Sequence, residues 1–375
     1  MDLKEYRSNI SRLYSDFDKS FAPEIMEQLS AQYAFVSASL SNFLPAIPIS
    51  RHEALYRQVL LHQKISILDE TSPWHPMQEL QCGFLENIDM NIIRNHPAVF
   101  CTMHTGSYRL INYFLKQHRI PFVLVANKQI VDTEKDRFEK HYNAFAVEGG
   151  LPLSLIDAEH PISALMMFRA LKKGYSLLLY IDGNTGAGEA FAENENICSV
   201  NFLAQNIYAR SGAAYLSFKA KVPLIPVVSL KPSAEINRLL FLKRIYPSNL
   251  RGESKSIIHH AIQQVYSQIE YFVTQYPGQW EGWLYLHKFA HIVNTPEINN
   301  LTPPVTKQTQ FNSNEFAIFK IDSNFFLLQK NTYASFQIDK NLYDFLSGGL
   351  SLETGIGKFN KSLLNNLVSK RILLK

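Results

Sequence analysis

Residues 98–110 read Ala-Val-Phe-Cys-Thr-Met-His-Thr-Gly-Ser-Tyr-Arg-Leu, so an apolar run ends at His104 and a helix-like pattern begins. In an α/β domain the carboxyl end of a strand delivers side chains to a crevice, and the following helix presents free N–H groups. A histidine placed there can act as a base, because its pKa lies nearest to neutral pH. Gly106 lets the backbone approach a ligand closely. A histidine that merely caps the helix is an equally good interpretation of these residues alone.

Outward from this junction, short apolar runs alternate with amphipathic segments. The runs lie at residues 98–103, 121–126, 151–156, 176–182 and 223–230. The amphipathic segments lie at residues 108–117, 133–146, 162–173, 206–219 and 254–276. This alternation predicts βαβ units, and therefore an α/β fold with a mainly parallel central sheet flanked by helices. Residues 237–246, which are apolar almost throughout, predict a further strand that is antiparallel at an edge.

Changes in hydrophobic spacing and composition along the chain predict four regions. Residues 1–95 carry apolar residues at helical spacing, which predicts a helical amino-terminal region packed on the core. Residues 96–293 form the α/β domain, and residues 294–310, rich in proline and polar residues, form a linker. Residues 311–375 contain three short strand patterns followed by two helical ones, which predicts a small winged-helix-like α+β domain.

Composition bounds the class of protein. The chain has 375 residues, of which 46% are hydrophobic and 12% aromatic, so it is globular and long enough for one large core and a smaller module. A net charge of +4 and a pI near 8.7 favour mild attraction to phosphates, membranes or acidic carriers. The sequence lacks a strongly basic block of the kind that would indicate a nucleic-acid partner.

Cysteine usage and the amino terminus indicate a cytoplasmic protein. The three cysteines are too scattered for a disulfide framework or a paired-cysteine zinc site, and the adjacent His259 and His260 have no partner at ligand spacing, so no metal site is expected. No signal-type apolar run follows the first residues. The apolar residues 34–49 fall short of the roughly 20 needed to span a membrane, which leaves peripheral contact at the inner face open.

Four blocks of the middle region together carry a family resemblance. They are residues 104–109 (His-Thr-Gly-Ser-Tyr-Arg), 180–188 (Tyr-Ile-Asp-Gly-Asn-Thr-Gly-Ala-Gly), 200–204 with 210–214 (Val-Asn-Phe-Leu-Ala and Arg-Ser-Gly-Ala-Ala), and 277–283 with 286–289 (Pro-Gly-Gln-Trp-Glu-Gly-Trp and Leu-His-Lys-Phe). In order and spacing they resemble the lipid A late (lauroyl/myristoyl-type) acyltransferases of the lysophospholipid acyltransferase superfamily, over residues 95–290. The resemblance implies the glycerolipid-acyltransferase fold.

The resemblance further implies transfer of an acyl group from a thioester to a hydroxyl or amine. The donor would be acyl-coenzyme A or a phosphopantetheinyl acyl carrier protein, with no tightly bound cofactor. His104 stands at the position of the family's general base. Removal of a proton by a positioned base increases the reaction rate about 10²- to 10⁴-fold. Backbone N–H groups at the helix start would hold the developing oxyanion.

Arg109 departs from the family, which has an acidic residue at this position to orient the histidine. An arginine cannot accept the imidazole N–H, and its charge would lower the histidine pKa. Three interpretations follow. In the first, Asp182, at the end of another core strand, replaces the missing acid. In the second, His104 works unaided on a more acidic acceptor while Arg109 binds a phosphate or carboxylate. In the third, catalysis has been lost and the fold is kept for binding.

The remaining candidate residues are expected to bind substrate. Arg210, before the helix-opening Ser211-Gly212, could contact a phosphate, although a solvated charge at the helix end explains it equally well. Asn201 and Phe202 are expected to line or brace the pocket, and Trp280, Trp283 and His287 to be structural. The full set of predicted substrate-binding residues is Gly106, Ser107, Arg109, Asn184, Asn201, Phe202 and Arg210, beside the predicted catalytic residues His104 and Asp182.

The final 60 residues resemble the PqqD-like recognition domain through hydrophobic spacing. Such domains bind leader peptides of ribosomally made peptide natural products along an exposed strand edge. The alternative is a generic small tail that packs on the catalytic domain.

Two hypotheses therefore follow from the sequence. The first is a thioester-dependent acyltransferase in peptide natural-product or lipid biosynthesis, with an acyl or peptidyl carrier protein and a leader peptide as partners. The second is a noncatalytic protein that uses a degraded acyltransferase cleft to hold a carrier while the tail presents a peptide.

Overall fold

The computed structural model describes residues 1–375 except 18, 20, 22, 86–89, 146, 150, 184–195, 294–309, 349–358 and 375. The chain forms two compact units. The first contains residues 1–18 and 57–291, and the second contains residues 19–56 and 292–375. Residues 19–56, assigned from the sequence to the amino-terminal helical region, thus belong to the same unit as the carboxyl-terminal segment. The predicted linker lies almost entirely outside the described residues.

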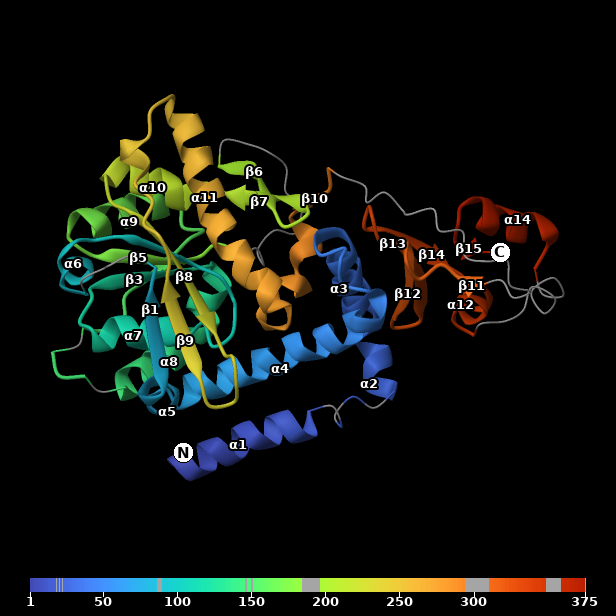
Figure 1. Cartoon of the computed structure of the whole chain (residues 1–375), viewed down its shortest axis with the longest axis horizontal. Helices are drawn as coiled ribbons and strands as arrows, with labels where there is room; N and C mark the ends of the chain where they lie inside the picture. Colours follow the sequence, from blue (N-terminus) through green and yellow to red (C-terminus); the bar gives the residue numbers. More distant parts are fainter. Residues whose placement is uncertain are drawn as a thin grey trace. The chain divides into compact units, whose positions relative to one another are not determined.

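A seven-stranded sheet with the order β1-β9-β8-β2-β5-β3-β4 forms the centre of the first unit (Figure 1). Its strands are β1 (Leu80–Phe84), β2 (Val99–Thr102), β3 (Phe122–Ala126), β4 (Leu155–Asp157), β5 (Ser176–Tyr180), β8 (Leu224–Leu230) and β9 (Asn237–Phe241). The five strands from β8 to β4 are parallel, which confirms the predicted α/β fold with a mainly parallel sheet.

The antiparallel end of the sheet differs from the sequence prediction in one respect. β9 is antiparallel to β8, as predicted, but it is not the edge strand, because β1 pairs with it in parallel. The prediction that residues 1–95 are helical is therefore wrong for Leu80–Phe84. These five residues have a mixed burial pattern without a helical period, and pairing with β9 supplies the backbone hydrogen bonds that a helix would otherwise provide.

Helices cover both faces of this sheet. Apolar side chains of α7 (Leu110–Gln117) and α8 (Lys128–Ala144) share a core cluster with Phe100, Leu124 and Leu178. The helices α9 (Ser163–Lys172), α10 (Gly212–Ala220) and α11 (Ser254–Gln275) contact the sheet strands and one another. The other helices of this unit are α1 (Leu3–Asp16), α4 (His52–Thr71, which begins in the second unit), α5 (Trp74–Gln78) and α6 (Met90–Asn95).

A small second sheet packs along α11. β6 (Ile197–Phe202) and β7 (Gln205–Arg210) form a hairpin, and β10 (Ala290–His291) pairs with β7. The segment 206–219, predicted as one amphipathic helix, is therefore a strand followed by α10. The carboxyl ends of β2 and β5 and the segment after α11 form the site described below.

The second unit combines α2 (Pro23–Gln28) and α3 (Ser30–Phe43) with the carboxyl-terminal segment. β12 (Phe316–Ile321), β13 (Asn324–Gln329) and β14 (Ala334–Ile338) form an antiparallel meander, and Ala34 and Ala38 of α3 pack on Phe319 and Leu328. The helices α12 (Lys340–Ser347) and α14 (Lys361–Ser369) and the strand pair β11 (Gln310–Phe311) and β15 (Leu373–Leu374) complete it. This small α+β arrangement agrees with the predicted fold class.

A lysine without an acidic partner among the described residues lies inside this second unit. Lys330 Nζ donates to Ser37 Oγ at 2.9 Å and to the Ser313 carbonyl at 2.8 Å, and His52 contacts the same hydroxyl at 3.0 Å. Burial lowers the pKa of Lys330 from 10.5 to about 8. Burial, followed by the charge of Lys330, lowers the pKa of His52 to about 4.

The stability of the second unit should therefore rise with pH. Because the folded state binds the Lys330 proton more weakly than the unfolded state, the penalty is fully present below pH 8 and disappears as pH approaches 10.5. The difference in unfolding free energy between wild type and Lys330→Met should change in favour of wild type by on the order of 3 kcal/mol across this interval. Urea unfolding followed by circular dichroism at both ends of the interval measures it. A constant difference would contradict this assignment.

Candidate active site

The junction between β2 and α7 carries His104. β2 ends at Thr102, and Arg109 is the N-cap of α7. Gly106 turns the chain with a φ of +51°, and a Cβ there would lie 2.9 Å from the Ser229 carbonyl oxygen. Only glycine combines this dihedral with such a close backbone approach. The sequence thus places His104 at the carboxyl end of a central parallel strand.

Asp182 pairs with His104. The two strands that precede them are neighbours, with Thr102 opposite Tyr180. The imidazole Nδ1 lies 2.8 Å from Asp182 Oδ1, and the His104 backbone N–H donates to Oδ2 at 2.9 Å. The Asp182 side chain is 1% exposed and that of His104 is 27% exposed. A carboxylate on Nδ1 favours the tautomer with the proton on Nδ1, which leaves Nε2 to accept a proton.

Trp280 is a further hydrogen-bond donor to Asp182. Its indole Nε1 donates to Oδ2 at 2.8 Å, so Oδ2 accepts two hydrogen bonds. Phe202 packs edge-on against the Trp280 ring at 5.4 Å, and Tyr266 donates to the carbonyl of Ile181 at 3.0 Å. These contacts fix the carboxylate in one orientation, and the predicted bracing residue Phe202 acts through Trp280.

The charges of the pair stabilise each other. Burial acts to lower the pKa of His104, but the charge and hydrogen bond of Asp182, together with the charge of Glu281, raise that pKa above its ordinary value. For Asp182, burial opposes ionisation, while the charge of His104 and the hydrogen bonds from His104 and Trp280 hold its pKa below the ordinary value. The rings of Tyr108 and Tyr180 lie 4.6 and 4.8 Å from the imidazole ring.

A short antiparallel contact holds the histidine turn from the other side. Thr105 pairs with Trp280, the Gly106 N–H donates to the Gln279 carbonyl at 2.9 Å, and the Glu281 N–H donates to the His104 carbonyl at 2.8 Å. We call residues 104–106 with 279–281 the site ribbon. It explains why a segment about 175 residues downstream of the histidine belongs to the site.

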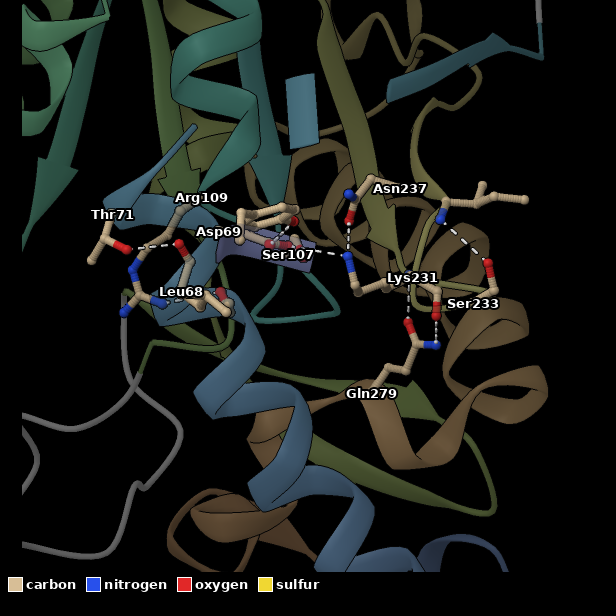
Figure 2. A network of polar contacts seen from close by, with 12 residues as sticks. Leu68, Asp69, Thr71, Ser107, Arg109, Lys231, Ser233, Asn237 and Gln279 are labelled. Atoms are coloured by element: carbon tan, nitrogen blue, oxygen red, sulfur yellow. Dashed lines mark hydrogen bonds and ion pairs between the residues drawn. The ribbon is translucent and has the colours of Figure 1, made fainter. Parts of the chain in front are cut away.

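Beneath the turn lies a buried network centred on Asp69 of α4 (Figure 2). Asp69 Oδ1 accepts from Tyr6 Oη at 2.6 Å, and Oδ2 accepts from Ser107 Oγ and from Lys231 Nζ, the latter at 3.4 Å. Lys231 also donates to Asn237 Oδ1 at 3.2 Å. The amide of Gln279 bonds the backbone N–H and C=O of Lys231, both at 2.8 Å, and so ties this network to the site ribbon. Removing one member of such a buried ion pair typically costs about 3–5 kcal/mol.

Arg109 is directed to α4. Its Nε lies 3.3 Å from Glu70 Oε2, its Nη1 donates to Ser66 Oγ at 3.1 Å, and its guanidinium covers the ring of Tyr108. The Arg109 side chain is 18% exposed. Its charge lowers the His104 pKa, as expected from the sequence, but it is the smallest of the influences on that pKa, whose net direction is upward.

The other predicted substrate-binding residues lie in different places. Ser107 is buried and bonded to Asp69, so its hydroxyl supports the turn. Asn201 is exposed, and its backbone bonds the side chain of Gln263. Arg210 ends β7 before α10. Asn184 lies outside the described residues.

Sequence reasoning missed several residues of the site: Asp69, Lys231, Gln279, Trp280 and Glu281. The sequence predicts Trp280 to be structural, although it lies in one of the four blocks that resemble the family. The available signal was its membership of that block. Asp69 and Lys231 carried no signal, because nothing in a helix pattern or a strand end indicates that two distant charges will meet.

A cavity of about 750 Å³ opens elsewhere in the first unit. It lies between α9, the start of β6, and the first turns of α10 and α11, with Met167, Cys198, Ser211 and Tyr215 in its wall. His104 is not among its lining residues. Within the described part of the chain, no group of three or more His, Cys, Asp or Glu side chains could hold a metal ion.

No protein-family model matches the chain. No curated protein matches it either. Among solved structures, the crystal structure of the 1-acyl-sn-glycerophosphate (LPA) acyltransferase PlsC from Thermotoga maritima is similar, with 10% identity and a TM-score of 0.31 over 66% of this chain and 98% of that one.

Replacing Asp182 with asparagine should lower the pKa of His104. The substitution removes the charge that raises it, while the burial that lowers it remains. Titration of the imidazole proton signals by NMR measures the change. The control is Asp157→Asn, another aspartate at the end of a parallel strand, whose carboxylate accepts from the Glu159 N–H. An unchanged His104 pKa in Asp182→Asn, or the same decrease in the control, would contradict the pairing.

Proposed function

We propose that the first unit is an acyltransferase that moves an acyl group from a thioester to a hydroxyl or amine, with His104 as general base and Asp182 as the residue that orients it. One observation carries the proposal: a half-buried histidine at the end of a central parallel strand, with Nδ1 held 2.8 Å from a buried carboxylate. This arrangement keeps Nε2 free of hydrogen bonds within the described residues and holds an imidazolium once it forms.

The reaction follows from that geometry. His104 Nε2 takes the proton of the acceptor as its oxygen or nitrogen attacks the thioester carbonyl, and Asp182 stabilises the resulting imidazolium. The bond from carbon to the acceptor forms, the C–S bond breaks, and the departing thiolate takes the proton from His104. The N–H groups at the start of α7, which the sequence predicts to hold the developing oxyanion, already bond to carbonyls of the preceding turn. Leu110 donates to Ser107 at 3.0 Å, Ile111 to Tyr108 at 3.4 Å and Asn112 to Arg109 at 3.2 Å, so that prediction is wrong for these groups.

The finer assignment rests on the sequence. The ordered blocks at residues 104–109, 180–188, 200–214 and 277–289 support the lysophospholipid acyltransferase superfamily, and within it the lipid A late acyltransferases. The proposed donors are acyl-coenzyme A or an acyl carrier protein. None of the helices in the described part of the chain is long and apolar enough to cross a membrane.

The second unit is the proposed site for a peptide partner. β14 pairs with β13 on one side, no described strand pairs with its other side, and Phe336 at its centre is 52% exposed. Such an edge can accept an added strand. The leader peptide implied by the PqqD-like resemblance stays a prediction.

Changing His104 to alanine should reduce thioester-dependent acyl transfer by about 10²- to 10⁴-fold, because the acceptor then loses its base. Thiol release from acyl-coenzyme A and acyl carrier protein donors of several chain lengths measures the activity. His260→Ala is the matched control, since His260 is exposed on α11 and bonds Gln264. Retained activity in His104→Ala would refute the assignment of the base. If wild type consumed no thioester, the noncatalytic carrier-binding protein would replace the enzyme as the better proposal.

A further inference from the structure

Glu281 lies directly opposite His104 in the site ribbon. The hydrogen bonds from the Gly106 N–H to the Gln279 carbonyl and from the Glu281 N–H to the His104 carbonyl flank the Thr105–Trp280 pair. In an antiparallel pair, residues opposite each other point to the same face with Cβ atoms about 4.5–5.5 Å apart. The carboxylate of Glu281 is therefore a neighbour of the imidazole, and its charge raises the His104 pKa.

One oxygen of this carboxylate has no partner within the described residues. The Glu281 residue is 6% exposed. Its Oε2 accepts a long hydrogen bond from Gln63 Nε2 at 3.4 Å, whereas Oε1 is buried and accepts none. Burial raises the pKa of Glu281 above its ordinary value, and the charge of Asp182 acts in the same direction. The charges of His104 and Arg109 and the hydrogen bond from Gln63 lower that pKa but do not cancel the effect of burial.

Among the described residues, the neighbouring groups are bonded elsewhere and leave this oxygen without a donor. Asp182 occupies Nδ1 of the imidazole, and Arg109, whose charge also acts on Glu281, is bonded to Ser66 and paired with Glu70. A buried acceptor without a donor typically costs about 1–3 kcal/mol, and more when charged. Because Oε1 is closed to solvent, a ligand reaches it only after the Glu281 side chain rotates. A ligand that then brings an N–H to Oε1 would recover this cost, so the oxygen points to the chemistry of the acceptor.

We propose that Glu281 binds the acceptor and selects a primary amine over an alcohol. This inference deepens the proposed acyl transfer and rests on it. A hydroxyl carries a single proton, which His104 Nε2 removes, and leaves nothing for Glu281. A primary amine carries enough N–H groups to bond both, and its ammonium form offsets the charge of a buried carboxylate.

The proton balance closes with this assignment. The acceptor arrives as an ammonium ion and gives one proton to Glu281. The neutral amine attacks the thioester carbonyl, and His104 takes a second proton as the C–N bond forms. The C–S bond breaks, the thiolate takes its proton from the imidazolium, and Glu281 releases its proton to water. The products are an amide, a thiol and one proton.

A competition between two acceptors of equal shape tests the proposal. The full-length chain receives the N-acetylcysteamine thioester of octanoic acid with equal concentrations of phenethylamine and 2-phenylethanol, and chromatography quantifies amide and ester after subtraction of the His104→Ala background. Wild type should form mainly amide. Glu281→Gln, which keeps the shape and removes the charge, should lower the amide-to-ester ratio roughly 10- to 100-fold.

Two further variants separate charge from structure. Glu281→Asp retains the charge and should keep a ratio nearer to that of wild type. Glu270→Gln makes the same chemical change at a carboxylate that bonds the Leu203 N–H away from His104, and should leave the ratio unchanged. Circular dichroism melting verifies that each variant is folded.

The outcomes distinguish a failure of the proposed acyl transfer from a failure of the proposed amine acceptor. Thioester consumption by wild type no faster than by His104→Ala refutes the proposed function itself. Consumption with mainly ester or no amide, or an unchanged ratio in Glu281→Gln, overturns the amine assignment and leaves the acyl transfer in place.

Discussion

The site depends on the hydrogen bonds that the buried carboxylate of Asp182 accepts. The carboxylate accepts from the ring and the backbone N–H of His104 and from the indole of Trp280, at 2.8, 2.9 and 2.8 Å. A buried charge is tolerated only when such donors surround it, because its desolvation otherwise costs several kcal/mol. Satisfying Asp182 therefore joins the ends of β2 and β5 to the segment after α11. The same three bonds that stabilise the charge also fix which imidazole nitrogen faces the substrate.

Two supports then hold the histidine turn in place. The site ribbon fixes the backbone of residues 104–106, and the Asp69 network anchors Ser107 from below. Gln279 belongs to both, because its carbonyl accepts from Gly106 and its amide bonds Lys231. This rigid support gives the base a defined position, as general-base catalysis requires. Glu281 enters the site as a consequence of the same ribbon.

The sequence predicted most of the sheet and the position of the histidine, because hydrophobic periodicity and the strand-to-helix junction are local signals. It offered Asp182 as one of three answers to the arginine at 109, and could not decide among them because the pairing depends on which strands are neighbours. β1 was missed because its short, partly exposed pattern has no strand alternation. The Asp69–Lys231 pair and the role of Trp280 arise only from contacts between residues more than 90 positions apart, so no local pattern indicates them.

The tautomer of His104 tests most directly whether Asp182 orients this residue as a base. ¹⁵N NMR of the imidazole in the neutral form distinguishes a protonated from an unprotonated ring nitrogen. The contact with Asp182 predicts a proton on Nδ1 and an unprotonated Nε2 that is available to an acceptor. A neutral ring with the proton on Nε2 would contradict it, because that nitrogen could then not serve as the base.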